Sequence, residues 1–472
     1  MVQLDEWIEG KKVLILGFGR EGQSTCRVLR AFGGYKELAI ADQADGKGRC
    51  PDKGISWISG PHYQQAMDNY DVVFKSPGIV LERPLKAYRC RIVSQTEIFV
   101  RMFRRQIIGV TGTKGKSTTA TLLYHVLKEA GKKVILVGNI GIPAFDHMEE
   151  IEEDTVIVFE LSCHQLEYLT VSPYMALLLN IHEEHLDHYG TMEKYIRAKE
   201  NIFRHQEEQD VLICHRQCFP ENQACCSEKF MVQEVQDSAL LCGGGQKASI
   251  DRDEQNWMGG EEQEIILNGK CICFRDEHFI IPVDEIQLLG QHNYLDIAFV
   301  YAACRLKGVN QKQFAQGLKT YQPLPHRLAF LGVHRGVKYY DDSISTICET
   351  AIQALQTIKD ADTILIGGMD RGIDYRELIV YLSESTVSHI LLMEATGKRI
   401  YKEIFRDYPG FKRAERLVLT EHLQEAVREA KRLTQPGKSC VLSPAAASYG
   451  IFTNFEERGD VFQALVFADD VR

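Results

Sequence analysis

Residues 107–118 read IIGVTGTKGKST, a short apolar run that leads through glycines and lysines into a segment with helical character. Consecutive backbone N–H groups after a strand, together with a helix N-terminus, form a cradle for phosphate. Lys116 can reach the outer phosphates of a nucleotide, and Ser117 can bind a magnesium ion. The spacing departs from the usual GxxxxGK pattern because Val110 stands where the first glycine would be.

We therefore predict a phosphate-binding loop at the end of a strand. The alternative is a glycine-rich turn with a structural lysine. The predicted loop residues are Gly112, Thr113, Lys114, Gly115, Lys116, Ser117 and Thr118.

A second glycine-rich turn lies near the N-terminus. The apolar run 13–16 is followed by GFGREG at 17–22, which contains Gly17, Gly19 and Gly22. GxGxxG between a strand and a helix is typical of dinucleotide sites, and Asp42 follows at the interval of a ribose contact. A nucleotide-sugar pyrophosphate would suit the same helix N-terminus. The alternative without a ligand is close packing of the helix on the strand.

Apolar runs of strand length alternate with helical patterns along most of the chain, which predicts α/β domains with parallel sheets. The predicted strands are 13–16, 38–41, 71–74, 107–110, 133–137, 156–160, 176–180, 337–341, 363–367, 389–393 and 439–442. The 472 residues fit about three domains. We place a Rossmann-like domain at 1–94, a central domain with the phosphate loop at 95–322, and a Rossmann-like domain at 323–472. The segment 207–285 is irregular and predicts antiparallel strands and loops.

The composition excludes several classes of function. A net charge of −10 provides no basic surface, so we expect no nucleic-acid partner. The opening residues MVQLDEWIEG lack the apolar region of a signal peptide, and no apolar run reaches the length of a membrane span. We expect a cytoplasmic protein without a membrane partner, whose 14 cysteines are reduced. Cys214, Cys218, Cys225 and Cys226 cluster without the spacing of a zinc site.

Two further stretches carry candidate metal ligands. Glu160 follows the apolar run 156–159, and a carboxylate at the end of a strand can hold Mg²⁺ beside phosphates. The stretch NIHEEHLDHY at 180–189 contains three histidines, of which His185 fits a magnesium or phosphate role. Zinc is the alternative, but HxxHxxH lacks the helical pairing of HExxH. Lys199, considered alone, reads as a surface lysine on a helix.

Nine ordered motifs resemble those of the Mur ligase family over nearly the whole chain, and the segment 207–285 matches least. The last motif, which begins at residue 442, is especially similar to the corresponding motif in the branch of the family that adds glutamate. The motifs are TGTKGKST from 111, GNIG from 138, ELSCHQLE from 160, NIHEEHLDHY from 180 with RAKENI from 197, LGQHNY from 289, LPHR from 324, YDDS from 340, GGMDRGID from 367 and LSPAAASYGIFTNFEERG from 442.

The resemblance implies a three-domain, ATP-dependent ligase that forms an amide bond through an acyl-phosphate. It implies that the first domain binds UDP-N-acetylmuramoyl-L-alanine, that the central domain binds ATP with two Mg²⁺ ions, and that the third brings glutamate, D-glutamate in particular. It also implies a cytoplasmic enzyme of peptidoglycan precursor synthesis, which we expect to be a monomer.

The resemblance also assigns roles to residues. Lys116 and Ser117 would hold the ATP phosphates and magnesium, while Glu160 and His185 would bind magnesium. Lys199 matches a lysine that is carbamylated in the family, so it would act as a carboxylate-like ligand of a second magnesium. The other matched positions are Asn293, His326, Arg327 and Asp342 for the nucleotide, Gly17, Gly19, Asp42, Ser76, Gly78 and Asn139 for the UDP-linked substrate, and Thr346, Arg371, Ser448 and Phe455 for glutamate.

Three positions depart from the family pattern. Ile344 stands where a lysine usually follows the Asp-Ser of the YDDS motif, and Arg371 replaces the lysine that meets the glutamate side chain. Asp296 replaces the asparagine that commonly lies three residues after Asn293. Arg371 keeps a cation that can pair with a carboxylate through two hydrogen bonds. An acidic amino acid therefore remains the expected substrate, while the choice between D- and L-glutamate stays open.

Two other functions compete with the glutamate-adding ligase. One is a sibling enzyme of the Mur and folylpolyglutamate ligase superfamily, against which the first domain and the last motif argue. The other is a dinucleotide-binding regulator or dehydrogenase built on the N-terminal domain, in which the phosphate loop and the histidine-rich stretch would have no role.

Overall fold

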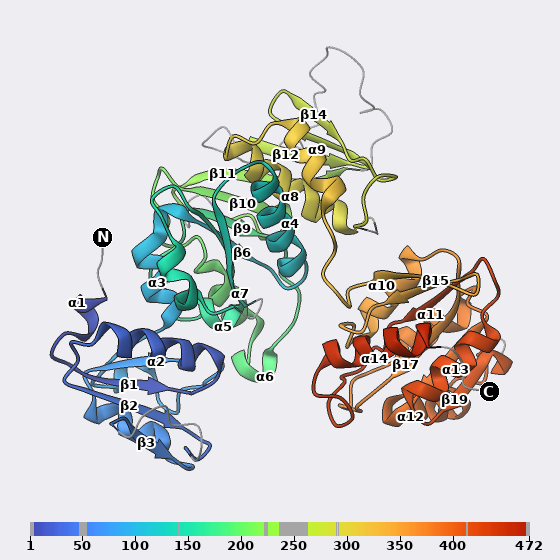
Figure 1. The fold of residues 1–472 in the computed structure, drawn as a ribbon, viewed down its shortest axis with the longest axis horizontal. Coiled ribbons are helices and arrows are strands. Elements are labelled where there is room, and N and C mark those ends of the chain that lie inside the picture. Colours follow the sequence, from blue (N-terminus) through green and yellow to red (C-terminus); the bar gives the residue numbers. More distant parts are fainter. Residues whose placement is uncertain are drawn as a thin grey trace. The chain divides into compact units, whose positions relative to one another are not determined.

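The computed structural model is an α/β protein with three sheets, which confirms the predicted fold class. The chain divides into two compact units, Met1–Ile286 with His292–Tyr321, and Gln287–Gln291 with Gln322–Arg472 (Figure 1). Among the described residues, none of the helices combines the length and apolar character that a membrane crossing needs. The structure describes residues 4–46, 54–139, 142–220, 225–235, 263–288, 290, 292–411 and 414–468.

The first sheet is parallel and has the order β3-β2-β1-β4-β5. The order reverses between β1 and β4, and ligands of open α/β sheets bind at such a reversal, beyond the carboxyl ends of the strands. Gly17 and Ser76 occupy these two strand ends. The strands are β1 (Lys12–Leu16), β2 (Glu37–Asp42), β3 (Ser56–Ser59), β4 (Val72–Lys75) and β5 (Arg91–Val93), and helix α2 (Arg20–Phe32) follows β1.

The second sheet has nine strands in the order β14-β13-β12-β11-β10-β9-β6-β8-β7. Strand β6 (Ile107–Thr111) lies between β8 (Val156–Glu160) and β9 (Met175–Leu178) and is parallel to both. Helix α4 (Lys116–Glu129) begins directly after the predicted phosphate loop. The loop, Glu160 and the residues after β9 therefore share one edge of the sheet, while β7 (Val134–Gly138) lies at its border.

The segment 207–285 differs in part from the prediction of antiparallel strands. Strand β11 is parallel to both β10 and β12, and only β12, β13 and β14 form antiparallel pairs. Parallel neighbours cannot be joined by a tight hairpin turn, and this separates β10, β11 and β12 from the hairpins of β12 with β13 and β13 with β14. The strands are β10 (Val211–His215), β11 (Glu228–Val235), β12 (Gln263–Asn268), β13 (Cys271–Phe274) and β14 (Glu277–Ile280).

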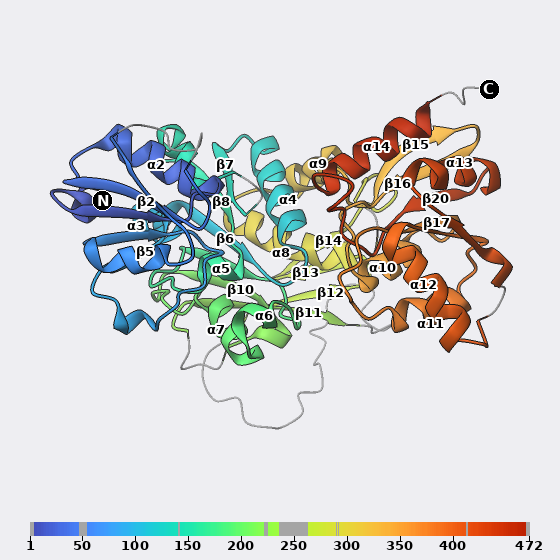
Figure 2. The same ribbon diagram turned by 90° about the horizontal axis from the view of Figure 1, so that it is seen from below.

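One apolar core joins the first two sheets, which explains why they form a single compact unit. The core runs from Ile15 and Phe74 of the first sheet through Phe99 to Phe159 of the second. Phe99 belongs to helix α3 (Gln95–Phe103), which begins where the Ser94 hydroxyl accepts a hydrogen bond from a backbone N–H. Helix α2 also contacts η4 (Ala144–Glu150), the segment after β7 (Figure 2).

The third sheet, in the second unit, has the order β15-β16-β20-β17-β18-β19, and only β15 is antiparallel to its neighbour. Alternating residues of β17 point to opposite faces: Ile364 and Ile366 pack under α10, α11 and α12, whereas Leu365 packs under α13 and α14. The strands are β15 (Ala329–His334), β16 (Val337–Asp341), β17 (Ala361–Gly367), β18 (His389–Met393), β19 (Leu417–Thr420) and β20 (Ser439–Leu442). The helices are α10 (Cys348–Thr357), α11 (Arg376–Glu384), α12 (Glu394–Asp407), α13 (Leu423–Leu433) and α14 (Phe455–Phe467).

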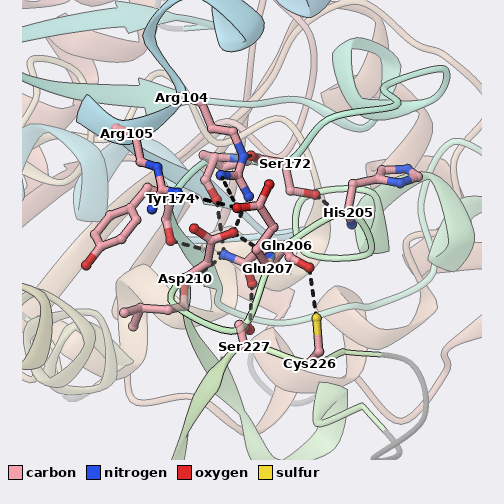
Figure 3. A network of polar contacts seen from close by, with 12 residues as sticks. Arg104, Arg105, Ser172, Tyr174, His205, Gln206, Glu207, Asp210, Cys226 and Ser227 are labelled. Carbon is pink, nitrogen blue, oxygen red and sulfur yellow. Dashed lines mark hydrogen bonds and ion pairs between the residues drawn. The ribbon is translucent and has the colours of Figure 1, made fainter.

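A buried polar network supports the edge of the second sheet opposite to the phosphate loop (Figure 3). Arg104, before β6, forms an ion pair with the fully buried Asp210, before β10, and donates from Nε to the Ser172 carbonyl at 3.0 Å. The Gln206 side chain donates to the Pro173 and Val211 carbonyl oxygens at 3.1 and 3.0 Å. These bonds connect the starts of β6, β9 and β10 and so fix the relative positions of the strands whose other ends form the site.

We predict that Arg104→Met lowers the free energy of unfolding by about 3–5 kcal/mol, because Asp210 would keep a buried charge without its cation. Arg105→Met is the matched control, since the Arg105 side chain is 58% exposed and its pair with Glu207 spans 3.4 Å. A surface pair of this kind contributes less than about 1 kcal/mol. Denaturant unfolding measures both values, and an equal loss in the two variants would contradict a structural role for the buried pair.

Candidate active site

The predicted phosphate loop has the geometry of an anion cradle. Gly115 has a φ of 80° and precedes α4, whose first N–H groups have no partner within the helix. The Lys116 ammonium group folds back over the loop and donates to the carbonyl oxygens of Gly112 and Thr113, each at 3.0 Å. Ser117 and Thr118 follow in the first turn of the helix, where a phosphate would meet both backbone and side chain.

Two residues that the sequence analysis missed shape this loop. The Asn180 side-chain oxygen accepts the backbone N–H groups of Thr113 and Lys114 at 3.1 and 2.8 Å. The Thr113 hydroxyl lies 3.0 Å from the Tyr195 hydroxyl and accepts the His182 N–H at 2.9 Å. Thr113 and Lys114 therefore hold the shape of the loop through these bonds. Asn180 could have been identified from its place directly after β9, at the edge where β6 also ends.

Helix α8 (His292–Leu306) brings Asn293 and Asp296 to the same region. Both side chains are buried. A Cβ atom added to Gly115 would lie 2.5 Å from a carboxylate oxygen of Asp296. The first turn of α8 is thus adjacent to the phosphate loop. This position agrees with the expectation that Asn293 contacts the nucleotide.

Glu160 is a buried carboxylate, and one of its two oxygen atoms has no hydrogen-bond partner among the described residues. Its side chain is fully buried, and Oε1 accepts a hydrogen bond from the Asn139 amide at 2.9 Å. Its Oε2 has no hydrogen-bond partner among the described residues, although it is buried as well. Buried polar atoms are nearly always paired, so an unpaired carboxylate oxygen beside a phosphate loop fits a divalent cation.

Lys199 is buried and is therefore no surface lysine. It lies in α7 (Met192–Glu200), is 1% exposed, and donates from Nζ to the Gly112 carbonyl at 2.8 Å. Its ammonium group also lies 5.0 Å from the centre of the Tyr195 ring. Burial first, and then the nearby Lys116 ammonium group, lower the pKa of Lys199 to about 7. A large fraction of its amine is consequently neutral near pH 7.

His185 adopts a left-handed backbone conformation with a φ of 56°. Such a conformation is uncommon outside glycine and concentrates at functional sites. Its ring centre lies 5.0 Å from that of His164, and its Nε2 lies 3.8 Å from a carboxylate oxygen of Glu184. His188 instead pairs with Glu167 at 3.1 Å, so the three histidines of this stretch do not converge on one ion.

A cavity of about 390 Å³ is lined by part of this set, and Ser117 and Glu160 are not among its lining residues. It brings together five predicted residues from the first and second sheets, and it adds six that the sequence analysis did not assign. The predicted lining residues are Gly78, Lys116, Asn139, His185 and Lys199, and the others are Pro77, Ser162, Cys163, His164, Glu184 and Tyr195.

The N-terminal glycine-rich turn is only partly open to a ligand. Gly17 has a φ of 91°, and its carbonyl accepts the Ser76 hydroxyl at 3.0 Å. A side chain at Gly22 would meet the Gly17 carbonyl at 2.0 Å, which is the close helix–strand packing of the alternative interpretation, whereas Gly19 faces open space. The Asp42 carboxylate accepts the N–H groups of Phe18 and Ala44 at 2.7 and 2.9 Å. Asp42 therefore orders the turn itself.

A smaller cavity of about 200 Å³ adjoins the first, because Pro77 and His164 line both. Its walls include the cations of Lys75, Arg91 and Arg101. Lys75 is buried, and burial lowers its pKa to about 8. The Glu97 carboxylate lines the same cavity and pairs with Arg101 at 2.6 Å, so three cations and one carboxylate surround it.

The second unit contains His326, Arg327 and Asp342, the remaining residues that the sequence analysis predicted for the nucleotide. His326 also has a left-handed backbone, with a φ of 61°, and its Nδ1 lies 2.7 Å from the Asp341 carboxylate, whose hydrogen bond raises the pKa of His326. Arg327 has a buried Nε without a hydrogen-bond partner among the described residues. Asp342 is buried, accepts the Leu328 N–H at 3.1 Å, and has its pKa raised by burial to about 7.

The four residues predicted for glutamate lie around the ends of β16, β17 and β20. Arg371 is exposed and donates to the Thr346 carbonyl at 3.2 Å, while Ser448 is buried. The ring of Phe455 lies 6.3 Å from that of His326, measured between centres. The sequence analysis assigned no role to Arg458, which is fully buried.

Arg458 holds the loop after β16 against the loop after β20. It donates to the Ser343 carbonyl at 2.7 Å and to the Ala446 carbonyl at 3.0 Å. The Ser343 hydroxyl in turn donates to the Phe455 carbonyl at 2.8 Å. Arg458 thereby positions the segment between residues 443 and 455, and the motif NFEERG could have pointed to it.

Known proteins resemble this chain over almost its full length. A family model described as the Mur ligase middle domain matches residues 110–304. A UDP-N-acetylmuramoylalanine–D-glutamate ligase of Alkaliphilus metalliredigens is 30% identical over 97% of this chain and 98% of its own length. The ligase of the same name from Clostridium kluyveri is 31% identical over 98% and 97%.

The chain belongs to the Mur ligase family. Two crystal structures of Mur ligases from Thermotoga maritima show the same fold. The alanine ligase MurC has a TM-score of 0.54 at 17% identity, covering 96% of this chain and 98% of its own. MurF, solved with ADP, has a TM-score of 0.56 at 14% identity, covering 98% and 96%. Mur ligases are ATP-dependent enzymes that form amide bonds, and this chain is a ligase of that class.

We predict that Gly115→Ala weakens ATP binding at least about tenfold, or about 1.4 kcal/mol. Its methyl group would lie 2.5 Å from Asp296 and displace the phosphate loop. Gly131→Ala is the matched control, because Gly131 follows the other end of α4 with the same φ of 80° and has open space beside it. Titration with a non-hydrolysable ATP analogue and Mg²⁺ measures both affinities, and equal affinities would argue against a nucleotide at this loop.

Proposed function

We propose that this Mur ligase joins glutamate to UDP-N-acetylmuramoyl-L-alanine at the expense of ATP, with D-glutamate as the first candidate. The names of relatives that match over nearly the full length support this substrate pair. The observation that carries the proposal is the cavity where Lys116, Lys199 and the Glu160 partner Asn139 meet Gly78 of the first sheet. The groups proposed to bind phosphate and Gly78, which is proposed to contact the UDP-linked substrate, thus line the same cavity.

We assign two Mg²⁺ ions to Ser117, Glu160, His185 and a carbamylated Lys199. The unpaired Oε2 of Glu160 and the hydroxyl of Ser117 are oxygen ligands of the type that Mg²⁺ prefers. When bound, Mg²⁺ offsets the negative charge that develops on the transferred phosphoryl group. Asn139, which lines the cavity, donates to one oxygen of Glu160 and leaves the other for a metal ion.

The burial of Lys199 and its lowered pKa support the proposed carbamylation. The neutral amine adds to CO₂, a nitrogen–carbon bond forms, and one proton leaves to solvent. The resulting carbamate carries a negative charge beside the Lys116 ammonium group, where the unmodified ammonium would be repelled. The modification therefore replaces an unfavourable charge pair with a favourable one.

The chain's residues then have definite tasks in the reaction. The Lys116 ammonium group stabilises the charge on the phosphate oxygens while the substrate carboxylate attacks the terminal phosphorus. The carboxylate oxygen bonds to phosphorus, the bond to ADP breaks, and an acyl-phosphate results. The amine of glutamate attacks this acyl carbon and loses a proton, and inorganic phosphate leaves as the amide forms.

We assign the two substrates to the predicted residues of each unit. For the UDP-linked substrate we assign Gly17 and Gly19 after β1, Asp42 at the end of β2, and Ser76 and Gly78 after β4, all in the first unit. In the second unit, Arg371 can bind the glutamate side-chain carboxylate through two hydrogen bonds, with Thr346, Ser448 and Phe455 around it. L-glutamate is the second candidate, because Ile344 and Arg371 replace both lysines that the family usually has on this side.

We expect phosphate release when UDP-N-acetylmuramoyl-L-alanine, ATP, Mg²⁺ and D-glutamate are combined, and much slower release when D-glutamate is omitted. L-glutamate, assayed in parallel, tests the second candidate. Release with L-glutamate alone would exclude the D-isomer and retain the ligase, whereas release with neither amino acid would contradict the proposed substrates.

We predict that Lys199→Ala lowers kcat at least about a hundredfold, because the charge of the carbamate stabilises the transition state. Added formate or acetate should restore part of the activity by supplying the missing carboxylate. Lys194→Ala, an exposed position of the same helix, is the control and should be unaffected. With ¹³C-labelled bicarbonate, a carbamate signal should appear in the chain without substitutions and be absent from Lys199→Ala. A signal that persists in the variant would place the carbamate elsewhere.

A further inference from the structure

The β13–β14 hairpin presents a cluster of metal-binding side chains that the ligase reaction does not use. The two strands pair so that Cys273 lies directly opposite His278. Residues 272, 274 and 279 are buried apolar side chains on one face of the hairpin. Because side chains alternate along a strand, Cys271, Cys273 and His278 must lie together on the opposite face.

The apolar face of the hairpin fixes its position in the protein. Phe279 stacks on Tyr301 of α8 with ring centres 5.0 Å apart, and Phe314 packs edge-on to both rings. The other face is accessible, since His278 is exposed and both cysteines are partly exposed. The apolar face thus anchors the hairpin, and the opposite face presents two thiols and one imidazole toward solvent.

The three ligand atoms already lie close to the arrangement that a metal ion needs. Cys273 Sγ lies 3.1 Å from His278 Nδ1, and the two sulfur atoms and one ring nitrogen all lie within 4.8 Å of one another. Bonds of about 2.3 Å to sulfur and 2.0–2.1 Å to nitrogen in a tetrahedron separate the ligand atoms by roughly 3.5–3.8 Å. The separation of 3.1 Å between Cys273 and His278 lies within about 0.5 Å of this range, and the strand pairing already places the three side chains on one face.

We propose that Cys271, Cys273 and His278 bind one thiophilic metal ion, Zn²⁺ in the first instance, with water in the fourth position. Two cysteine thiolates and a neutral imidazole form a soft ligand set that favours Zn²⁺ over Mg²⁺. Binding releases the two thiol protons to solvent and leaves His278 bonded through Nδ1. The ion bridges β13 and β14 and stabilises the border of the nine-stranded sheet.

This site is distinct from the magnesium ligands of the active site. Strand β13 lies five positions from β6 in the sheet order. At about 4.8 Å between neighbouring strands, that separation is roughly 24 Å. Within the described part of the chain, no other group of three His, Cys, Asp or Glu side chains places its ligand atoms within 4.8 Å. The cysteines at 214, 218, 225 and 226 therefore do not compete as a preformed site.

Titration of the reduced, metal-stripped full chain with Co²⁺ tests the proposal, with excess Mg²⁺ present throughout. We expect one equivalent of Co²⁺ to give a thiolate charge-transfer band in the near ultraviolet and visible bands of tetrahedral type. Zn²⁺ should abolish both by displacing Co²⁺. Equilibrium dialysis should show one Zn²⁺ per chain bound in the presence of Mg²⁺.

Cys273→Ser should abolish the charge-transfer band and the bound Zn²⁺, and Cys271→Ser should do the same if the first variant folds poorly. His278→Ala should weaken binding at least tenfold and alter the visible bands. Cys226→Ser is the control, because Cys226 is an exposed cysteine outside the hairpin, and it should leave the band unchanged. A band that is missing from the unmodified chain, or that survives both hairpin cysteine substitutions, would overturn the proposal.

Discussion

The carbonyl oxygen of Gly112 accepts hydrogen bonds from two lysines, and the active site is organised around this contact. Lys116 approaches at 3.0 Å from the start of α4, and Lys199 approaches at 2.8 Å from α7. Burial first, and then repulsion between the two neighbouring ammonium groups, lower the pKa of Lys199 to about 7. A carbamate on Lys199, or a nucleotide phosphate beside it, would supply negative charge and so offset this accumulation of positive charge.

The sheet topology explains why these groups meet. Strands β6, β8 and β9 are parallel neighbours, so their carboxyl ends share one edge and place the phosphate loop, Glu160 and Asn180 side by side. The opposite edge is closed by the buried pair of Arg104 and Asp210, which ties the strand starts together. The core shared with the first sheet then brings Gly78 into the same cavity. A site of this kind needs the whole first unit to be intact.

The sequence predicted the buried strands well and the border strands poorly. Runs such as 13–16, 156–159 and 390–393 are continuous and apolar because both faces of a central parallel strand are covered. The strands that escaped prediction in the first and third sheets, β3, β5, β15 and β19, all lie at sheet borders. One face of a border strand contacts solvent, so its pattern is short and mixed and resembles a loop.

For the site, motifs with local geometry were predictable and contacts across the fold were not. The phosphate loop could be located because its strand, turn and helix are contiguous. The support of Thr113 by Tyr195 joins residues 82 positions apart, and local spacing carries no information about it. Similarly, Cys271, Cys273 and His278 do not follow a zinc-finger spacing, and only the pairing of β13 with β14 brings them together.

The central claim is that this chain activates a carboxylate by phosphorylation at the loop around Gly112. Transfer of ¹⁸O tests it most directly, with the alanine carboxylate of UDP-N-acetylmuramoyl-L-alanine labelled and the released phosphate analysed by mass spectrometry or ³¹P NMR. The account predicts that each phosphate released during amide formation carries one labelled oxygen, since that oxygen leaves the acyl-phosphate with phosphorus. Amide formation with unlabelled phosphate, or label found in AMP, would contradict it.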